Sequence, residues 1–442
     1  MPRSSAVEPV SNLLEVVRTN RVKVAIGSVA IVAWGLIFDE LARVGYWVLD
    51  TAYSPLLGQY HDLRLRYDGA GKLLHHHSLY SFGPNPDSNP PFAALAFLPF
   101  HVIGWRATET VWTVLSLCAL AVVLMVVLVR WFGVPASSAW LASGAGLAAA
   151  GVAVLYPVRS ELVWGQLGLV LLALVMVDLF VVPRRYRGVL IGVAAAIKLF
   201  PALFIVWLLA RREVAATIRL VVSFLACTLV AALVWWHEST QYWLHILPSY
   251  KLLQLTFLPL QRGITRASWI LGVGHLGNQS LRGLLGRPPF LWFGTFPWLP
   301  VALVVLVVGI YATVGLLRQQ RDLAAVVTLF VTTMLATPVS WLHYWVFVAL
   351  APFVAVLEWR RDRALSIAAI VLTLATCADL EDAQLFNGPV TSVAPVLLFV
   401  VRNLYVLGAL CFLVVAVLRS RGAASTTERT AAIAEPTAVT AR

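Results

Sequence analysis

The sequence predicts an all-α polytopic membrane protein, and three observations support this fold class. Hydrophobic residues make up 60% of the 442 residues, whereas charged residues make up 12%. Apolar stretches recur along the chain, and several approach the ~20 residues that cross a bilayer as a helix. Arginines gather in the short segments between these stretches, as the positive-inside rule expects for cytoplasmic turns. We therefore expect about ten spans, a re-entrant helix pair and an interfacial amphipathic helix.

The expected spans are defined by the length of each apolar stretch. Some reach crossing length by themselves, and the shorter ones depend on packing against neighbours. In chain order they are residues 22–49, 111–129, 138–156, 162–182, 217–236, 298–317, 323–337, 345–357, 365–378 and 396–418.

Two apolar stretches carry features that argue against a simple crossing. Residues 92–104 follow two prolines and contain Pro99, so we expect an interrupted amphipathic helix at the membrane interface. Residues 188–210 have arginines before and after them, with Lys198 and Pro201 in the middle. This pattern predicts a re-entrant pair of half-helices with both ends on the cytoplasmic side.

The positive-inside rule then orders the whole chain. Residues 1–21 form a cytoplasmic segment without the features of a signal peptide, so the first span is expected to be uncleaved. Residues 22–418 form the membrane domain, with external loops at 50–91 and 237–297. Residues 419–442, rich in Ala and Thr, are expected to be a disordered cytoplasmic tail.

Composition also limits the partners and cofactors. The formal net charge of +12 follows from the cytoplasmic arginines, because no segment is both basic and independent of the membrane, and nucleic acid is not an expected partner. The four cysteines lie in apolar stretches, which excludes a disulfide framework and metal-site spacing. Residues 75–77, three consecutive histidines, are expected to be a polar loop, so we expect no metal and no cofactor.

The expected topology places acidic and basic residues on one face. Asp62 and Asp68 lie in the first external loop, Arg262 and Arg266 in the second, and His343 in a later external turn. A carboxylate can take the proton of an incoming hydroxyl while cations stabilise a departing phosphate. A phosphate leaves without prior protonation, and a single displacement inverts the anomeric carbon. Either aspartate could be the base. They are about one and a half helical turns apart, and only one of them need face the site.

Each candidate also has a structural interpretation. The arginines could contact lipid headgroups, and His343 could belong to an aromatic interface belt. Lys198 could satisfy carbonyl groups at a helix break, although a charge in an apolar segment usually has a partner or a task. Gln166 could bind sugar or cap a helix.

An ordered set of short motifs covers residues 55 to 355. They are Asp62-Leu-Arg-Leu-Arg-Tyr67, Leu79-Tyr80, Pro90-Pro91-Phe92, Gly165-Gln166, 192–201, Asn278-Gln279-Ser280-Leu281 and 338–343. In this set and order the chain resembles glycosyltransferase family 87, the polyprenol-phosphate-mannose-dependent alpha-1,2-mannosyltransferases of the actinobacterial envelope. One departure is that the family's last motif commonly continues with an acidic residue and paired histidines, where this chain has Leu342-His343-Tyr344.

The resemblance implies the C-type membrane glycosyltransferase fold, with Asp62 as the catalytic base and His343 near the donor phosphate. It also implies that Asn278, Gln279 and Ser280 lie near the donor or its sugar. Combining both lines, we expect a donor phosphate site of His343, Arg262, Arg266 and Lys198. The expected sugar and acceptor site contains Asp68, Gln166, Asn278, Gln279, Ser280 and Tyr344.

The expected activity is transfer of mannose from polyprenyl-phosphate-mannose to a hydroxyl of a glycolipid or lipoglycan. It would take place on the outer face of the plasma membrane, with a phosphatidylinositol mannoside among the possible acceptors. Three alternatives stay open from the sequence. Related enzymes transfer arabinofuranose from decaprenyl phosphate, a transporter or flippase could carry a lipid-linked sugar, and a non-catalytic assembly partner would leave Asp62 without a task. A transporter usually shows inverted repeats, and here one broken hairpin is visible.

Overall fold

The computed structural model describes residues 60–75, 77–80, 89–138, 140–247, 276–287, 298–380 and 395–421. Throughout this part of the chain the regular structure is helical, with an isolated β-bridge between Asn278 and Trp341. The chain forms two compact units, the first of residues 1–208 and 213–253 and the second of residues 209–212 and 254–442.

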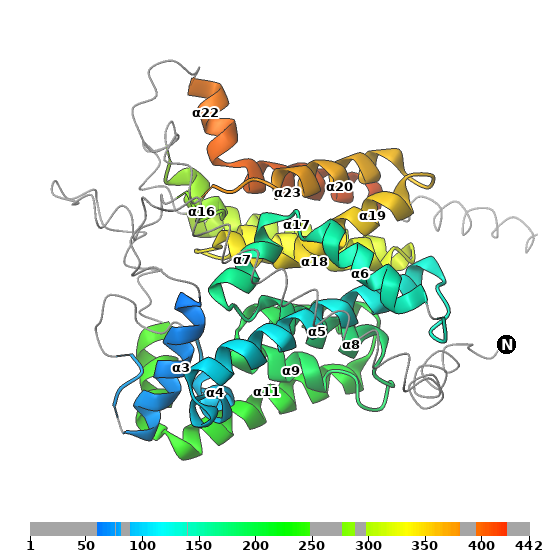
Figure 1. The fold of residues 1–442 in the computed structure, drawn as a ribbon. Coiled ribbons are helices and arrows are strands. Elements are labelled where there is room, and N and C mark those ends of the chain that lie inside the picture. The colour runs from blue at the N-terminus through cyan, green and yellow to red at the C-terminus, as the bar shows by residue number, and fades with distance from the viewer. Residues whose placement is uncertain are drawn as a thin grey trace, which may run out of the picture. The chain divides into compact units, whose positions relative to one another are not determined.

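The first unit is built from helices that pack in neighbouring pairs. Helix α5 packs against α6 and α8, α9 packs against α8 and α11, and α3 lies on α4 (Figure 1). In chain order the elements are α3 (His61–Leu74), α4 (Pro91–Ile103), α5 (Trp105–Phe132), α6 (Trp140–Val152), α7 (Tyr156–Trp164), α8 (Gly168–Phe180), α9 (Val189–Ile197), η2 (Phe200–Phe204), α10 (Ile205–Ala210, which ends in residues of the second unit), α11 (Val214–Val234), α12 (Trp236–Thr240) and the π-helix η3 (Gln241–Ile246).

Helices α9 and α11 approach closely because small residues face each other. A Cβ atom at Gly188 would collide with the carbonyl of Ala216, and one at Gly192 would collide with Ser223. Buried Asp178 of α8 accepts the backbone N–H groups of Gly188 at 2.6 Å and Ile191 at 2.8 Å. The first turn of α9 is thus capped from a neighbouring helix, which satisfies donors that a helix start leaves open.

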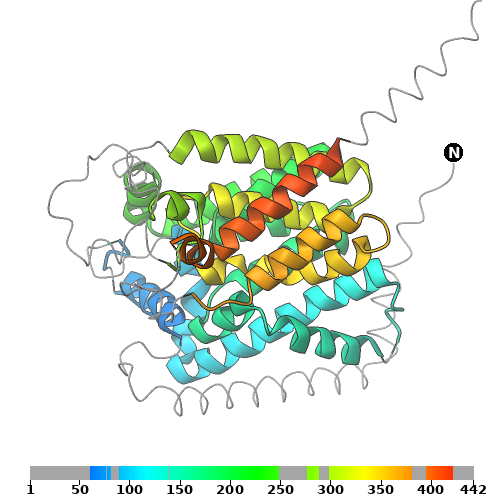
Figure 2. The same ribbon diagram turned by 90° about the horizontal axis from the view of Figure 1, so that it is seen from above.

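The second unit surrounds one almost fully buried helix, α18 (Asp322–Ala336). It is mostly apolar, has no solvent-exposed face, and packs against α17 (Trp298–Arg318), α23 (Leu404–Ser420) and η5 (Leu342–Leu350). Helix α20 (Arg363–Ala375) lies beside α23, and both are seen side by side in Figure 2. The remaining elements are α16 (Leu281–Leu285), α19 (Ala351–Glu358) and α22 (Pro395–Arg402).

Three of the described helices, α5, α11 and α17, are long and apolar enough to cross a membrane. Two further pairs reach that length only if a sharp bend is accepted, α6 with α7 at 96° and α22 with α23 at 82°. The structure therefore shows a helical membrane protein with three to five candidate spans among the described residues, fewer than the ten expected. Several expected spans are helices of 13 to 15 residues, such as α8, α18 and α20.

Three boundaries bear directly on the sequence-based expectations. The break expected near Lys198 is present, because α9 ends at Ile197 and Lys198 has an extended backbone. The expected interruption at Pro99 is wrong, because α4 starts at Pro91 and runs through Pro99. The helix ends instead before Gly104, whose φ is +85°. The span expected at 396–418 bends at Asn403. The expected first span at 22–49, the segment 1–21 and most of the tail lie outside the described residues.

Candidate active site

Helix α3 is held in place by its first residues. Tyr60, its N-cap, has a left-handed backbone with φ +66°, which places its N–H 2.8 Å from the carbonyl of Val163 at the end of α7. The Tyr60 hydroxyl lies 2.7 Å from the hydroxyl of Thr113 on α5. The start of α3 is therefore fixed by a main-chain and a side-chain bond to two different helices.

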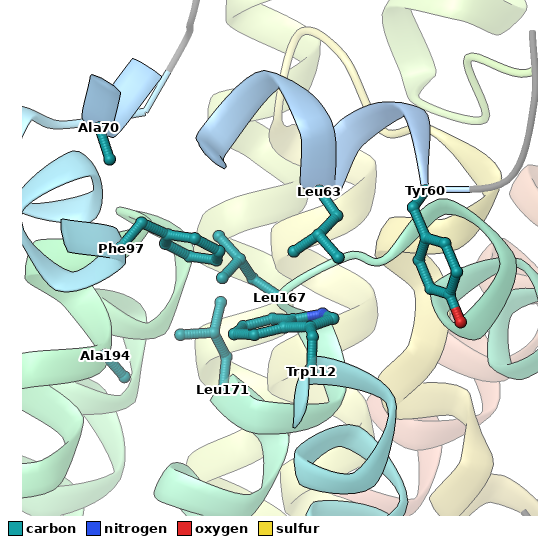
Figure 3. Packing of buried hydrophobic residues seen from close by; sticks show 8 residues of the cluster. All are labelled: Tyr60, Leu63, Ala70, Phe97, Trp112, Leu167, Leu171 and Ala194. Carbon is teal, nitrogen blue, oxygen red and sulfur yellow. The ribbon is translucent and has the colours of Figure 1, made fainter. Parts of the chain in front are cut away.

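An apolar cluster under α3 completes this attachment. Figure 3 shows Leu63 pointing from α3 toward Trp112 of α5 and Leu167, which precedes α8, with Tyr60 at one side. At Gly165 the backbone has φ +64°, and a Cβ there would come within 2.6 Å of Leu63 Cβ. Glycine is thus required at this turn both for its conformation and for the close approach of α3.

Asp62 lies beside this turn in the first turn of α3, and both of its carboxylate oxygens are engaged. The Gln166 amide donates a hydrogen bond to Oδ2, and Nδ1 of His61 lies 3.1 Å from Oδ1. The side chain of Asp62 is still 24% exposed. These contacts hold the carboxylate in one orientation. Because each carboxylate oxygen has a second lone pair, the group can still accept a hydrogen bond from another donor.

Buried Arg66, one turn further along α3, fixes the orientation of Gln166. Its Nη2 donates to Gln166 Oε1 at 2.6 Å, while Nη1 donates to the carbonyls of Asp62 at 2.9 Å and Gly165 at 3.3 Å. With its oxygen taken by Arg66, the amide presents its N–H to Asp62. Arg66, Gln166 and Asp62 thus form one network between α3 and the turn before α8.

His61 is the titratable neighbour of Asp62. The hydrogen bond to Asp62 raises the pKa of His61, with partial burial opposing this effect and the negative charge of Asp62 adding to it. In its protonated form, His61 favours the ionised, proton-accepting form of the Asp62 carboxylate.

Asp68 has a different environment from Asp62. It pairs with Arg64, with Arg64 Nε and Asp68 Oδ2 3.0 Å apart, and both side chains are nearly half exposed. The Arg64 guanidinium also lies 4.8 Å from the ring centre of Trp105. Of the two aspartates, Asp62 is therefore the one incorporated into a buried polar network.

Lys198 and Glu161 add charges to the first unit. Glu161 of α7 is buried, and its Oε2 accepts the N–H of Leu169 at 3.2 Å. Half-buried Lys198 lies close enough to interact electrostatically with Glu161, as does Arg66. Lys198 therefore lies near the buried Glu161 carboxyl group, whereas its expected contact with a phosphate stays a prediction.

In the second unit, the structure brings together two of the predicted motifs. The N–H of Gln279 donates to the Ser340 carbonyl at 2.8 Å, and the N–H of Ser340 donates to Asn278 Oδ1 at 2.9 Å. The Ser280 hydroxyl caps α16 and donates to the Pro338 carbonyl at 3.2 Å. These side chains shape the loop through backbone contacts, and a direct role in sugar binding stays a prediction.

His343 and Tyr344 follow this loop at the start of η5. His343 is buried, Tyr344 is partly exposed, and their rings pack edge to face at 4.7 Å. The expected phosphate ligands Arg262 and Arg266 lie outside the described residues. The structure thus places Asp62, Asp68, Gln166 and Lys198 in the first unit, and Asn278, Gln279, Ser280, His343 and Tyr344 in the second.

Sequence reasoning missed Arg66, His61 and the burial of Glu161. A signal for Arg66 existed, because it lies four residues after Asp62 and therefore on the same helix face. The described residues hold no group of three or more His, Cys, Asp or Glu side chains that could bind a metal.

Comparison with known proteins adds family information to this geometry. The sequence profile of glycosyltransferase family 87 matches residues 88–340. A polyprenol-phosphate-mannose-dependent alpha-(1-2)-phosphatidylinositol mannoside mannosyltransferase of Mycobacterium tuberculosis is 31% identical over 71% of this chain and 72% of its own. Its Mycolicibacterium smegmatis counterpart is 30% identical over 66% of this chain and 67% of its own.

A second group of relatives differs in the named acceptor. A polyprenol-phosphate-mannose-dependent alpha-(1-2)-phosphatidylinositol pentamannoside mannosyltransferase of Mycobacterium tuberculosis is 28% identical over 69% of this chain and 68% of its own. No solved structure matches this chain significantly.

Proposed function

Because this chain belongs to glycosyltransferase family 87, it is a glycosyltransferase, and we propose that it transfers mannose from polyprenyl-phosphate-mannose to a phosphatidylinositol mannoside. The names of the relatives support mannose over arabinofuranose as the donor sugar, and the family match supports an enzyme over a transporter or an assembly partner. The Arg-rich cytoplasmic turns support a site on the extracytoplasmic face of the plasma membrane.

The proposed reaction is a single displacement with Asp62 as general base. The acceptor hydroxyl oxygen forms a bond to the anomeric carbon while its proton passes to the Asp62 carboxylate. The bond between that carbon and the phosphate oxygen breaks, and polyprenyl phosphate leaves with the electron pair. Attack from the face opposite to the phosphate inverts the anomeric centre.

One observation carries the assignment of Asp62: its carboxylate is partly exposed and at the same time oriented by hydrogen bonds on both oxygens. A general base must reach the hydroxyl and must keep its geometry, and these contacts provide both. The Arg66–Gln166 pair supports this geometry, since Arg66 decides which end of the amide faces Asp62. The expected phosphate-binding cations His343, Lys198, Arg262 and Arg266 complete the proposal.

The test is transfer of radiolabelled mannose from polyprenyl-phosphate-mannose to phosphatidylinositol mannoside in membranes that contain wild type, Asp62→Asn or Asp68→Asn at matched protein levels. We expect Asp62→Asn to lower the rate by about 10²- to 10⁴-fold, because an amide keeps the shape but does not accept the proton. Asp68→Asn is expected to have a much smaller effect. The reverse order of effects would assign the base to Asp68, and full activity of both variants would refute the mechanism.

Lys72→Gln serves as the control, since Lys72 is exposed on the same helix and lies outside the network. Transfer of mannose from polyprenyl-phosphate-mannose, together with no transfer of arabinose from decaprenyl-phosphate-arabinose by the same membranes, would confirm the donor sugar. Transfer of arabinose and not of mannose would refute it.

A further inference from the structure

Arg282, the second residue of α16, is a buried cation without a hydrogen-bond acceptor in the described part of the chain. The residue is 6% exposed, and its Nη2 atom is fully buried and makes no hydrogen bond. The guanidinium lies over the face of Trp298, whose ring centre is 5.8 Å from the guanidinium carbon. Burial lowers the pKa of Arg282, which reflects the cost of holding this charge away from water.

Arg287, five residues later, shows that acceptors are available in the same region. Its guanidinium donates to Asn403 Oδ1 at 2.5 Å, to the Asn278 carbonyl at 2.5 Å and, more weakly, to the carbonyls of Leu276 and Arg402. Arg287 thus acts as a structural link between α16, the Asn278 loop and the bend at Asn403. Arg282 takes no part in this arrangement although it is nearly as deeply buried.

The surrounding sequence offers no compensating negative charge. Residues 248–297 contain Lys251, Arg262, Arg266, Arg282 and Arg287, and they contain no Asp or Glu. A buried charge without a counter-charge is costly, and buried charges in proteins are normally paired. An anion is the partner that this stretch lacks.

We propose that Arg282 binds the phosphate of a lipid substrate, with Trp298 holding the guanidinium in place from its other side. This inference rests on the proposed function, because a lipid phosphate is the anion that both proposed substrates carry. A guanidinium suits this task because its planar, forked donors match two phosphate oxygens. Arg282 was not among the phosphate ligands expected from the sequence, and it adds a phosphate-binding residue whose surroundings are described.

A direct binding experiment tests the proposal. The full-length protein in phosphatidylcholine nanodiscs is titrated with polyprenyl phosphate, comparing wild type, Arg282→Gln, Arg282→Lys and Arg318→Gln. Arg318 is an exposed residue at the far end of α17 and provides the matched control. We expect binding to weaken at least about tenfold in Arg282→Gln, to recover partly in Arg282→Lys and to be unchanged in Arg318→Gln.

Thermal unfolding distinguishes a ligand-binding arginine from a structural one. Without ligand, Arg282→Gln should unfold at the wild-type temperature or above it, because the change removes an uncompensated buried charge. Polyprenyl phosphate should raise the unfolding temperature of the wild type and not that of the variant. A lower unfolding temperature of ligand-free Arg282→Gln, with unchanged binding, would show a structural role and overturn the proposal.

A parallel titration with phosphatidylinositol identifies the source of the phosphate. If Arg282→Gln binds polyprenyl phosphate more weakly than the wild type does, Arg282 is assigned to the donor phosphate. If it binds only phosphatidylinositol more weakly, Arg282 is assigned to the acceptor phosphate. Wild-type affinity of Arg282→Gln for both lipids refutes the proposal. Neither titration requires mannose transfer, so loss of the proposed function and loss of this phosphate site give different results.

Discussion

Two charge clusters lie at opposite ends of α17, and they differ in whether the positive charges are balanced. Just after the C-terminal end of α17, a side-chain nitrogen of Arg321 lies 2.9 Å from a carboxylate oxygen of Asp362 and 3.5 Å from one of Glu358. A side-chain nitrogen of Arg419 lies 3.2 Å from Asp362. We call these four residues the balanced cluster. At the start of α17, Arg282 and Arg287 form what we call the carboxylate-free pair, because none of their contacts described above involves Asp or Glu.

The comparison separates charges that hold the fold from charges that are available to a ligand. In the balanced cluster, each buried carboxylate meets an arginine, and removal of one partner leaves the other in an unfavourable environment. Within the carboxylate-free pair, Arg287 is satisfied by neutral oxygens, and Arg282 is not satisfied by the described protein atoms. The balanced cluster, Arg287 and Arg282 should therefore differ in how much a mutation lowers the stability of the fold.

Arg321→Met should have the largest effect on stability. The change leaves Asp362 and Glu358 buried without their main counter-charge, which costs about 3 kcal/mol. The apparent unfolding temperature in detergent should therefore fall by several degrees. Arg360→Gln, an exposed neighbour, is the control, and equal unfolding temperatures of Arg321→Met and wild type would mean that the balanced cluster does not stabilise the fold.

Arg287→Met should have an intermediate effect. It removes the donors to Asn403 Oδ1 and to the carbonyl oxygen of Asn278, and buried acceptors that lose their donors cost about 2 kcal/mol. The measurement is the same unfolding experiment, with Arg282→Gln beside it. The comparison fails if Arg282→Gln is destabilised as much as Arg287→Met.

The pair of His61 and Asp62 should show the smallest effect, because both side chains are partly exposed. The pKa of His61 is raised in the folded state, so its stabilising contribution is present below the unfolded value of about 6.5 and is lost as the pH rises through the higher folded value. The contribution should stay below ~1 kcal/mol.

The measurement for this pair is the difference in unfolding temperature between wild type and His61→Asn at several pH values between 5 and 9. The wild type should be more stable at the acidic end, and the difference should shrink as the pH rises. A difference that grows with pH would contradict the assigned sign.

The sequence was sufficient for some features because they depend on local patterns. Lys198 and Pro201 inside an apolar stretch predicted the helix break that the structure has after Ile197. Family membership was also predicted from the ordered set of short motifs, and the family profile that matches residues 88–340 confirms it. The general helical membrane class followed from composition.

Other features could not be predicted because they depend on contacts between distant segments. Gln166 meets Asp62 only through the docking of α3 onto the turn before α8, across 104 residues of sequence. The ten expected spans are not confirmed by the described residues, which hold three to five candidates, and hydrophobic length does not report bends such as the 96° between α6 and α7. The difference between Arg282 and Arg287 likewise depends on the position of Asn403, far along the chain.

Helix α17 gives the two charge clusters a fixed separation. Its 21 residues extend for roughly 30 Å, close to the hydrocarbon thickness of a bilayer. If α17 crosses the membrane, the balanced cluster lies at one surface and Arg282 at the other, with Trp298 at the depth that tryptophan prefers. A lipid phosphate diffusing laterally would then reach Arg282 at the level of its own headgroup, without leaving the membrane. The length of α17 would thus select lipid substrates by the depth of their phosphate in the membrane.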